Sequence, residues 1–295
     1  MANTNYDNQM ISARIGRGLK DLLGDSSGVM AFVGLILLSL FILIAIFAPL
    51  IAPYSPIKPS GAPFLSPQWG HIMGTDNLGY DVFSRFLWGS RTAFVIAVFA
   101  TLLAAFVGIP AGLFVGYAGG TVDRIVTMIM DSIYTFPGLI LAIAIVAMLG
   151  PGVVDISLAI AVVYIPTYYR VIRSQVSTIK SELYVEGARS IGAKNMTIIS
   201  KYILPNVLPS TIVVLSMNIA DAIMTEAGLS FLGLGMVPPT PDWGYDLANG
   251  QRFLLQNDWW MVFFPGLAII LIVLGFSMFA EGLDEYFNPN IGEKR

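Results

Sequence analysis

The chain has 295 residues, of which 56% are hydrophobic and 12% are charged, and its formal net charge is −3 at pH 7. Soluble domains carry about 25% charged residues, so this composition indicates a protein of the lipid bilayer, and the acidic balance gives no indication of nucleic-acid binding. The absence of cysteine excludes disulfides and thiolate metal sites, and a single histidine excludes a centre with several histidine ligands.

Apolar stretches long enough to cross about 30 Å of hydrocarbon recur along the chain. We expect six membrane spans, at residues 29–51, 92–116, 124–149, 154–174, 207–229 and 259–281. The first stretch is too long for the core of a signal peptide and lacks a small-residue cleavage site, so we expect it to be retained. The predicted fold class is an all-α polytopic membrane protein, in which residues 92–281 form a core of five spans.

Lys and Arg are distributed unevenly over the polar segments. Twelve of the 16 lie in residues 1–28, 117–124, 170–201 and 282–295. The other four lie in residues 52–91 and 230–258. Because basic residues concentrate on the cytoplasmic side, we expect both terminal segments to be cytoplasmic tails and the last two segments to be external loops. The predicted location is the cell membrane.

The first external loop opens with closely spaced prolines, which end the preceding helix and favour extended chain. Thr75 or Asp76 is expected to cap a short helix that continues through Trp88. The apolar side chains on one side of that helix suit a position along the membrane surface.

Four glycines end the second span at intervals of four residues: Gly108, Gly112, Gly116 and Gly120. On a helix this spacing places them on one face, where small residues let two backbones approach closely in lipid. The spacing favours an ordinary packing contact between helices. A sliding or pore-lining contact is the alternative.

The candidates for lining a pathway are Asp131, Tyr168, Asn218 and Asp221. An ionisable group inside a span is by default a functional-site hypothesis. For Asp131 the alternative is a position near the cytoplasmic interface, paired with Arg124 or a neighbouring helix. For Tyr168 it is an interfacial aromatic belt. Residues 136–138, Phe-Pro-Gly, interrupt the third span, which lipid tolerates only beside protein or water.

Residues 175–206 form a long polar loop between the fourth and fifth spans. Glu182 suits the start of a helix and Gly192 suits its end, which predicts a helix of about ten residues, or ~15 Å. A second short helix is expected from Asn195 to Ile203, ending at Pro205. Most loops that join helices are shorter than this one, which argues against a simple connection.

The centre of the first of these helices is small, at Gly187 and Ala188, while Val185, Ala188 and Ile191 are expected to share another face. A helix with a small centre suits recognition by a groove on another protein. The same stretch is similar to a phosphate-binding loop. Ala193 stands where that motif needs its lysine, so we do not expect this chain to bind ATP through it.

Several motifs carry a family resemblance that spans about residues 29–290. The polar loop resembles the EAA loop of ABC-transporter permeases through Glu186-Gly187-Ala188, Gly192 and Leu204-Pro205. The external segments resemble those of the dipeptide and oligopeptide group through Gly74-Thr75-Asp76, Gly79, Asp81, Ser84-Arg85, residues 226–235, residues 238–241 and Trp243-Gly244. The Ala-Pro-Tyr start of the first loop is similar to the C-type subunit of that group.

The resemblance implies a type I importer with a methionine-permease-like transmembrane fold. It implies a B-type permease subunit as heterodimer partner, two cytoplasmic ATPases that bind ATP and Mg²⁺, and an external solute-binding protein. It implies neither a cofactor nor a catalytic residue in this chain. The residues that it assigns to coupling with an ATPase are Glu186, Gly187, Ala188, Arg189, Gly192, Leu204 and Pro205. The candidates for external docking are Asp76, Asp81, Arg85 and Trp243.

The substrate class that the resemblance implies is di- or oligopeptides, with oligosaccharides or nickel chelates as alternatives. A proton-coupled secondary transporter is a more remote alternative, because it needs an embedded relay and inverted repeats. An intramembrane enzyme needs a nucleophile with a base, or a metal set, and the single histidine, His71, supplies neither.

Overall fold

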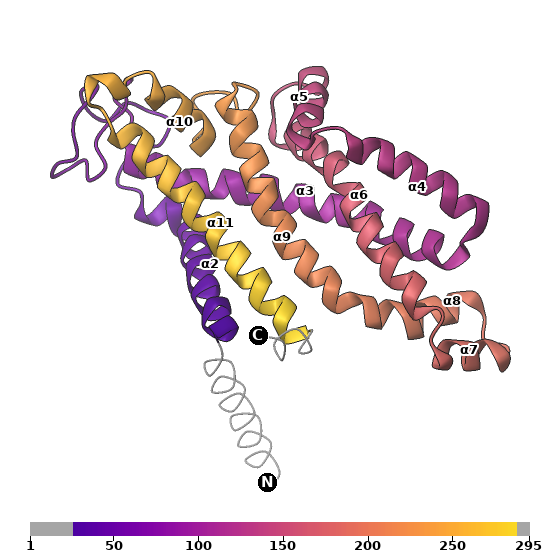
Figure 1. The fold of residues 1–295 in the computed structure, drawn as a ribbon. Helices are drawn as coiled ribbons and strands as arrows, with labels where there is room; N and C mark the ends of the chain where they lie inside the picture. Colours follow the sequence, from indigo (N-terminus) through magenta and orange to yellow (C-terminus); the bar gives the residue numbers. More distant parts are fainter. Residues whose placement is uncertain (1–25, 288–295) are drawn as a thin grey trace, which may run out of the picture.

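The computed structural model describes residues 26–287, and these are almost entirely helical (Figure 1). The long helices are α2 (Ser26–Ile51), α3 (Val82–Ala118), α6 (Val153–Ile179), α9 (Leu204–Phe231) and α11 (Trp260–Phe287). The shorter helices are α4 (Gly120–Thr135), α5 (Gly138–Leu149), α7 (Leu183–Ser190), α8 (Asn195–Ile198) and α10 (Trp243–Gln251), with the single turns η1 (Ile199–Ile203) and η2 (Leu254–Gln256). Figure 1 shows α10 at one end of the long helices and α7 with α8 at the other.

Five helical stretches are long and apolar enough to cross a membrane, and α4 with α5 makes a sixth if the bent pair counts as one span. The prediction of an all-α polytopic fold is therefore confirmed. The third predicted span, residues 124–149, is not one straight helix, because α4 and α5 meet at 90°. Pro137 has no N–H to donate, and Phe136 is extended with φ −72° and ψ 137°, so the helix ends before it restarts at Gly138.

The predicted short helix capped by Thr75 or Asp76 is wrong. The cap is Asp81, whose carboxylate accepts a hydrogen bond from the Ser84 backbone N–H at 2.7 Å, and the helix that begins at Val82 continues to Ala118. The last ten residues of the predicted first loop are thus the first turns of α3. Asp76 instead organises a turn, because Oδ1 accepts from the backbone N–H groups of Leu78 and Tyr80 at 2.8 and 2.9 Å.

The glycine stripe is a packing contact between α3 and α6. A Cβ at Gly108 would lie 2.6 Å from Tyr168 Cβ, and one at Gly112 would lie 2.8 Å from Ile172 Cβ. Gly116 lies against Arg173 in the same way. Gly120 does not belong to this contact: it is the first residue of α4, with φ +66°, and no described atom is within 4 Å of the position of a Cβ. Because the other three glycines have no side chain, the backbones of α3 and α6 approach each other closely over three turns.

Replacing Gly112 with leucine is expected to lower the free energy of unfolding by about 1–3 kcal/mol, because the new side chain must push α3 away from α6. The measurement is the thermal denaturation of the purified full-length chain in detergent. Ala118→Leu is the control, since Ala118 is exposed on the same helix and its replacement should change stability by no more than about 0.5 kcal/mol. Equal melting temperatures for the two variants would contradict the close contact.

The second predicted short helix does not end at Pro205. Residues 195–231 form one continuous helical stretch, in which α8, the π-helical turn η1 and α9 follow one another without a break. Pro205 lacks the N–H that a regular helical turn would need. The wide turn Ile199–Ile203 ends two residues before this proline. Next to this proline, the Asn206 side-chain amide donates to the Tyr202 carbonyl at 2.6 Å.

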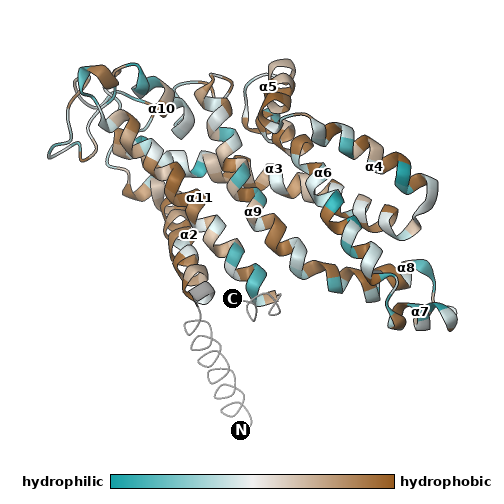
Figure 2. Cartoon of the chain, in the orientation of Figure 1, coloured by the Kyte–Doolittle hydropathy of each residue, from teal (hydrophilic) through white to brown (hydrophobic). Residues whose placement is uncertain are grey.

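The main apolar core joins α3, α6, α9 and α11, with α2 packed beside α11. Phe41 of α2 packs edge-on against Trp243 of α10, with ring centroids 5.9 Å apart, and so ties the first span to the loop end. Figure 2 shows hydrophobic residues along α2 and along most of α11. Many of these side chains are exposed within the chain, as expected for helices that face lipid or another subunit.

Candidate functional site

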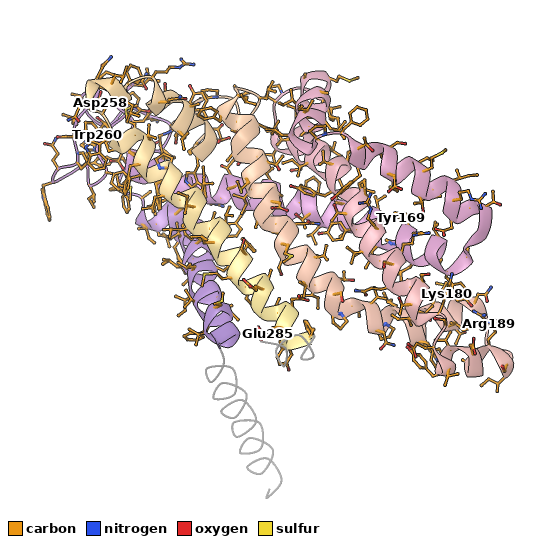
Figure 3. All side chains as sticks on the ribbon, viewed as in Figure 1. Tyr169, Lys180, Arg189, Asp258, Trp260 and Glu285 are labelled. Atoms are coloured by element: carbon orange, nitrogen blue, oxygen red, sulfur yellow. The ribbon has the colours of Figure 1, made fainter. Side chains whose placement is uncertain are left out.

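The short helix α7 lies at one end of the molecule and is held by its inner face. Val185 and Ala188 are buried against an apolar cluster at the ends of α3, α6 and α9. Members of that cluster include Leu113, Ile172 and Ile203. Figure 3 shows Lys180 and Arg189 at this end, far from Asp258 and Trp260 at the other. Val185 of α7 therefore belongs to one apolar cluster with residues of α3, α6 and α9.

The outer face of α7 is free. Leu183 and Ile191 are 83% and 84% exposed, and Glu186 and Gly187 are also exposed. No atom lies within 4 Å of the position of a Cβ at Gly187. Ile191 was expected on the face of Val185 and Ala188, and this is wrong, because the helix ends at Ser190. Large apolar side chains beside a carboxylate on an exposed face are typical of a protein interface.

The flanks of α7 are fixed by polar contacts. The Lys180 ammonium donates to the Gly116 carbonyl at 2.9 Å, where it satisfies an acceptor near the end of α3. The Arg189 guanidinium lies over the ring of Tyr117 at 5.9 Å, and the hydroxyl of Tyr117 donates to Asn195 Oδ1 at 3.0 Å. These contacts connect α7 to α3 independently of the apolar cluster.

The seven residues predicted for coupling thus have different surroundings. Glu186, Gly187 and Gly192 are exposed, and Gly192 takes φ +86° where the chain turns after α7. Ala188 is buried, and Leu204 packs beside the apolar cluster. Arg189 contacts Tyr117, and Pro205 lies in the first turn of α9. Exposed positions can contact a partner, whereas the buried ones hold the helix in place.

At the opposite end, residues 52–81 and 232–259 pack together into what we call the loop platform. Arg85 is its central residue. Its guanidinium binds both carboxylate oxygens of Asp246, with Nη2–Oδ1 at 2.6 Å and Nε–Oδ2 at 3.1 Å. It also donates to the carbonyls of Pro56 and Pro239 at 3.0 and 2.9 Å. One buried side chain therefore joins both loops to α3.

Asp81 is a second junction of the loop platform. Its Oδ2 accepts from the Ser84 hydroxyl at 2.7 Å, and its Oδ1 lies 2.9 Å from His71 Nδ1. The His71 ring in turn stacks on Tyr54, with centroids 4.8 Å apart. The single histidine is thus a buried structural residue. Within residues 26–287 no group of three or more His, Cys, Asp or Glu residues is placed to hold a metal ion.

The four residues predicted for external docking are all buried within this chain: Asp76, Asp81, Arg85 and Trp243. The indole N–H of Trp243 donates to the Phe86 carbonyl at 3.0 Å, which fixes α10 on α3. Within this chain these four side chains therefore contact other parts of the loop platform. They hold together the surface that a docked protein would meet.

Burial governs the electrostatics of the loop platform. It raises the pKa of Asp246 to about 6, against the opposing effect of the Arg85 charge. It also raises the pKa of Asp76, although backbone N–H groups partly offset it. Ser230 Oγ lies 2.9 Å from Glu226 Oε1 and 2.6 Å from Asp242 Oδ2. The Ser230 hydroxyl thus connects the end of α9 to the start of α10.

The four pathway candidates do not meet at one site. Asp131 pairs with Arg170 of α6 at 2.7 Å, and Arg170 also lies over the Tyr134 ring at 4.0 Å. Tyr168 and Asn218 are buried and lie next to each other where α6 and α9 pack, although neither Tyr168 Oη nor Asn218 Nδ2 has a partner at good hydrogen-bond geometry within the described residues. Asp221 is exposed on α9.

A polar groove between α4 and α6 contains Asp131 and was only partly anticipated. Its volume is about 710 Å³, and its lining includes Asp123, Thr127 and Arg173. Arg173 binds both carboxylate oxygens of Asp123, one of them at 2.7 Å through Nη2. The sequence indicated Arg124 or a neighbouring helix as the partner of Asp131, and the structure has the second: Arg170 on α6. The sequence did contain a signal for the Asp123–Arg173 ion pair: Asp123 lies directly before the third predicted span and Arg173 near the end of the fourth.

Comparison with protein families matches residues 108–293 to the binding-protein-dependent transport system inner membrane component. Residues 29–68 match the N-terminal transmembrane domain of oligopeptide transport permease C. The chain belongs to this family of ABC-importer permeases. The resemblance drawn from the loop motifs is thereby confirmed, and this permease is a multi-pass protein of the cell membrane.

Curated relatives align with the permease over nearly its whole length. It is 40% identical over 264 residues to the dipeptide transport system permease protein DppC of Alkalihalophilus pseudofirmus, covering 89% of this chain and 86% of that protein. It is also 40% identical over 264 residues to the glutathione transport system permease protein GsiD of Escherichia coli, covering 89% and 87%. The probable D,D-dipeptide transport system permease protein DdpC of Escherichia coli is 37% identical over 261 residues, covering 88% and 87%.

Among solved structures, the permease is similar to the MetNI methionine ABC transporter in its inward-facing conformation. The TM-score is 0.54 at 16% identity, and the match covers 70% of this chain and 95% of that chain. At this identity the likeness shows the fold alone. It confirms the predicted type I importer transmembrane fold.

Proposed function

We propose that this permease is the C-type subunit of an ATP-driven importer for di- or oligopeptides. The observation that carries the proposal is the 40% identity over 89% of the chain to permeases named for dipeptide and glutathione transport. The importer contains a B-type permease as heterodimer partner, two ATPases that bind ATP and Mg²⁺, and an external solute-binding protein. No covalent chemistry is assigned to this chain.

In this proposal α7 is the element that contacts an ATPase. Its outer face offers Leu183, Glu186, Gly187 and Ile191 to a groove, and Gly187 allows close approach. Val185 on its inner face shares an apolar cluster with residues of α3, α6 and α9, so a displacement of α7 is expected to reach three membrane helices through that cluster. Because the cores of proteins are densely packed, such a displacement moves these helices rather than being absorbed.

The binding protein is proposed to dock on the exposed rim of the loop platform. Trp69 and Leu255 are fully exposed there, and Ile72 and Leu78 are more than half exposed. The buried junctions at Arg85 and Asp81 fix the loops that carry them. Docking then depends on the buried residues indirectly, through the shape of the rim.

Reconstitution in proteoliposomes tests the proposed function. We expect uptake of a labelled dipeptide or oligopeptide to require ATP, the ATPases, the B-type partner and the binding protein together. A labelled oligosaccharide and a nickel chelate serve as competing substrates. Uptake by this chain alone, driven by a pH gradient without ATP, would overturn the importer assignment, and transport of either competitor in place of peptides would overturn the substrate class.

A further inference from the structure

A groove lies where the first loop returns over the beginning of α3, at the loop-platform end. Its volume is about 500 Å³. Its lining is mostly apolar and includes Ile57, Val95, Val153 and Met236. Arg91 is the one charged residue among the side chains that line it, and no acidic residue lines it. The groove is separate from the polar groove of α4 and from α7.

Arg91 has no counterion within the described residues. Its guanidinium lies over the Trp88 ring, 5.0 Å from the centroid, and no described carboxylate is at ion-pair distance. Arg85, less than two turns earlier on the same helix, is buried and bound to Asp246. The two arginines therefore differ in role: Arg85 is satisfied inside the protein, whereas Arg91 presents an exposed cation beside an apolar groove.

Below Arg91 the same face of α3 carries an exposed apolar stripe. After Arg91, an apolar side chain recurs at intervals of three or four residues. These side chains are Val95, Phe99, Leu102 and Phe106, and each is exposed within the chain. From Arg91 to Phe106 the stripe runs about 22 Å along the helix axis. This distance exceeds the depth of one leaflet, about half of ~30 Å. Arginine and tryptophan lie where membrane proteins place them, at the interface, with apolar side chains below.

We propose that this groove binds one anionic phospholipid of the leaflet on the loop-platform side. The phosphate pairs with Arg91, which Trp88 orients, and an acyl chain lies along the stripe from Val95 towards Phe106. Charge complementarity favours this occupant over a purely apolar one, because a neutral helix from a partner would leave Arg91 without a counterion. The continuous apolar stripe favours a phospholipid over a free phosphate ion, because a phosphate ion has no apolar surface to bury against the stripe.

Lipid binding by the delipidated full-length chain, alone and in the assembled importer, tests the proposal. Native mass spectrometry would follow the addition of phosphatidylglycerol or phosphatidylcholine. We expect one phosphatidylglycerol to bind more tightly than phosphatidylcholine, whose choline compensates its phosphate, and Arg91→Gln to weaken phosphatidylglycerol binding at least five-fold and phosphatidylcholine binding by less. Arg252→Gln is the matched control, since Arg252 is also exposed at this end, and it should bind as the wild type does. Circular dichroism checks that both variants are folded.

Three results would overturn the proposal. One is equal phosphatidylglycerol binding by the wild type and Arg91→Gln. Another is displacement of bound phosphatidylglycerol by millimolar inorganic phosphate as effectively as by added phosphatidylglycerol, which would mean that the groove is a simple anion site. The third is binding by the isolated chain that disappears in the assembled importer, which would mean that another subunit covers the groove.

Discussion

Replacing Gly187 with tryptophan is expected to abolish ATP-driven transport while leaving the permease folded and inserted. The position is exposed and a Cβ there meets no atom of this chain within 4 Å, so a large side chain is accommodated locally. It blocks the close approach of α7 to a groove on an ATPase. We expect at least a ten-fold loss of uptake in proteoliposomes, with an unchanged melting temperature of the permease and loss of ATPase co-purification.

Gly187→Ala is the matched control. Alanine stabilises a helix by about 1 kcal/mol relative to glycine and adds only one methyl group, so transport should be retained. If the tryptophan variant transports at the rate of the alanine variant, α7 does not contact the ATPase through this face. If both variants fail, the position is sensitive for a reason other than bulk.

Glu186→Arg is expected to uncouple the importer by reversing the charge on the outer face of α7. Glu186 is exposed and forms no ion pair within the described residues, so the substitution should not unfold the chain. We expect uptake and the stimulation of ATP hydrolysis by the binding protein to fall together by ten-fold or more, since a like charge or an unpaired buried charge is costly at an interface. Wild-type levels of both would show that the coupling assignment is wrong.

Replacing Arg85 with glutamine is expected to produce the largest loss of stability. The side chain is buried, pairs with Asp246 and donates to the Pro56 and Pro239 carbonyls, so its removal leaves a buried carboxylate and unpaired acceptors. Breaking such a buried pair costs about 3–5 kcal/mol. Thermal denaturation in detergent should show a melting temperature lower by roughly 10 °C, and a protease should cut residues 52–81 more readily. Arg91→Gln, without added lipid, is the control, because Arg91 is exposed on the same helix.

The deficit of Arg85→Gln should depend on pH. With Arg85 present, burial already raises the pKa of Asp246 to about 6, and loss of the nearby cation raises it further. At pH 8 the variant therefore carries a buried, unpaired carboxylate, whereas at pH 5 that carboxyl is protonated and neutral. The difference in melting temperature between wild type and variant should shrink from pH 8 to pH 5. A difference that is equal at both values would contradict the role assigned to the Arg85–Asp246 pair.

The general fold could be predicted because it depends on properties that single residues carry. Apolar runs located the spans, and the glycines at 108, 112 and 116 marked the face of α3 that packs closely on another helix, although not which helix that is. Glu182 and Gly192 located α7 to within a residue at each end. These signals are local, so they can be read from the sequence without knowing which segments contact one another.

The errors concern backbone continuity and partners distant in sequence. Pro137 ends a helix with a 90° bend, whereas Pro205 is absorbed by a wide turn, and the two prolines look alike in the sequence. The resemblance made Arg85 a candidate for external docking, but it gave no sign that Arg85 pairs inside the chain with Asp246, 161 residues away. Whether a charge faces water or a distant carboxylate is decided by tertiary packing, which no spacing in the chain reveals.

Site-specific labelling of Gly187 tests most directly the central claim that α7 is the contact with an ATPase. The natural chain has no cysteine, so Gly187→Cys provides a single thiol for a maleimide reagent. A cysteine at Trp69, which is fully exposed at the opposite end, is the control. We expect the thiol at position 187 to react rapidly in the permease alone and at least ten-fold more slowly in the importer assembled without its binding protein, while the thiol at position 69 reacts equally in both. Equal reactivity at position 187 with and without the ATPases would contradict the claim.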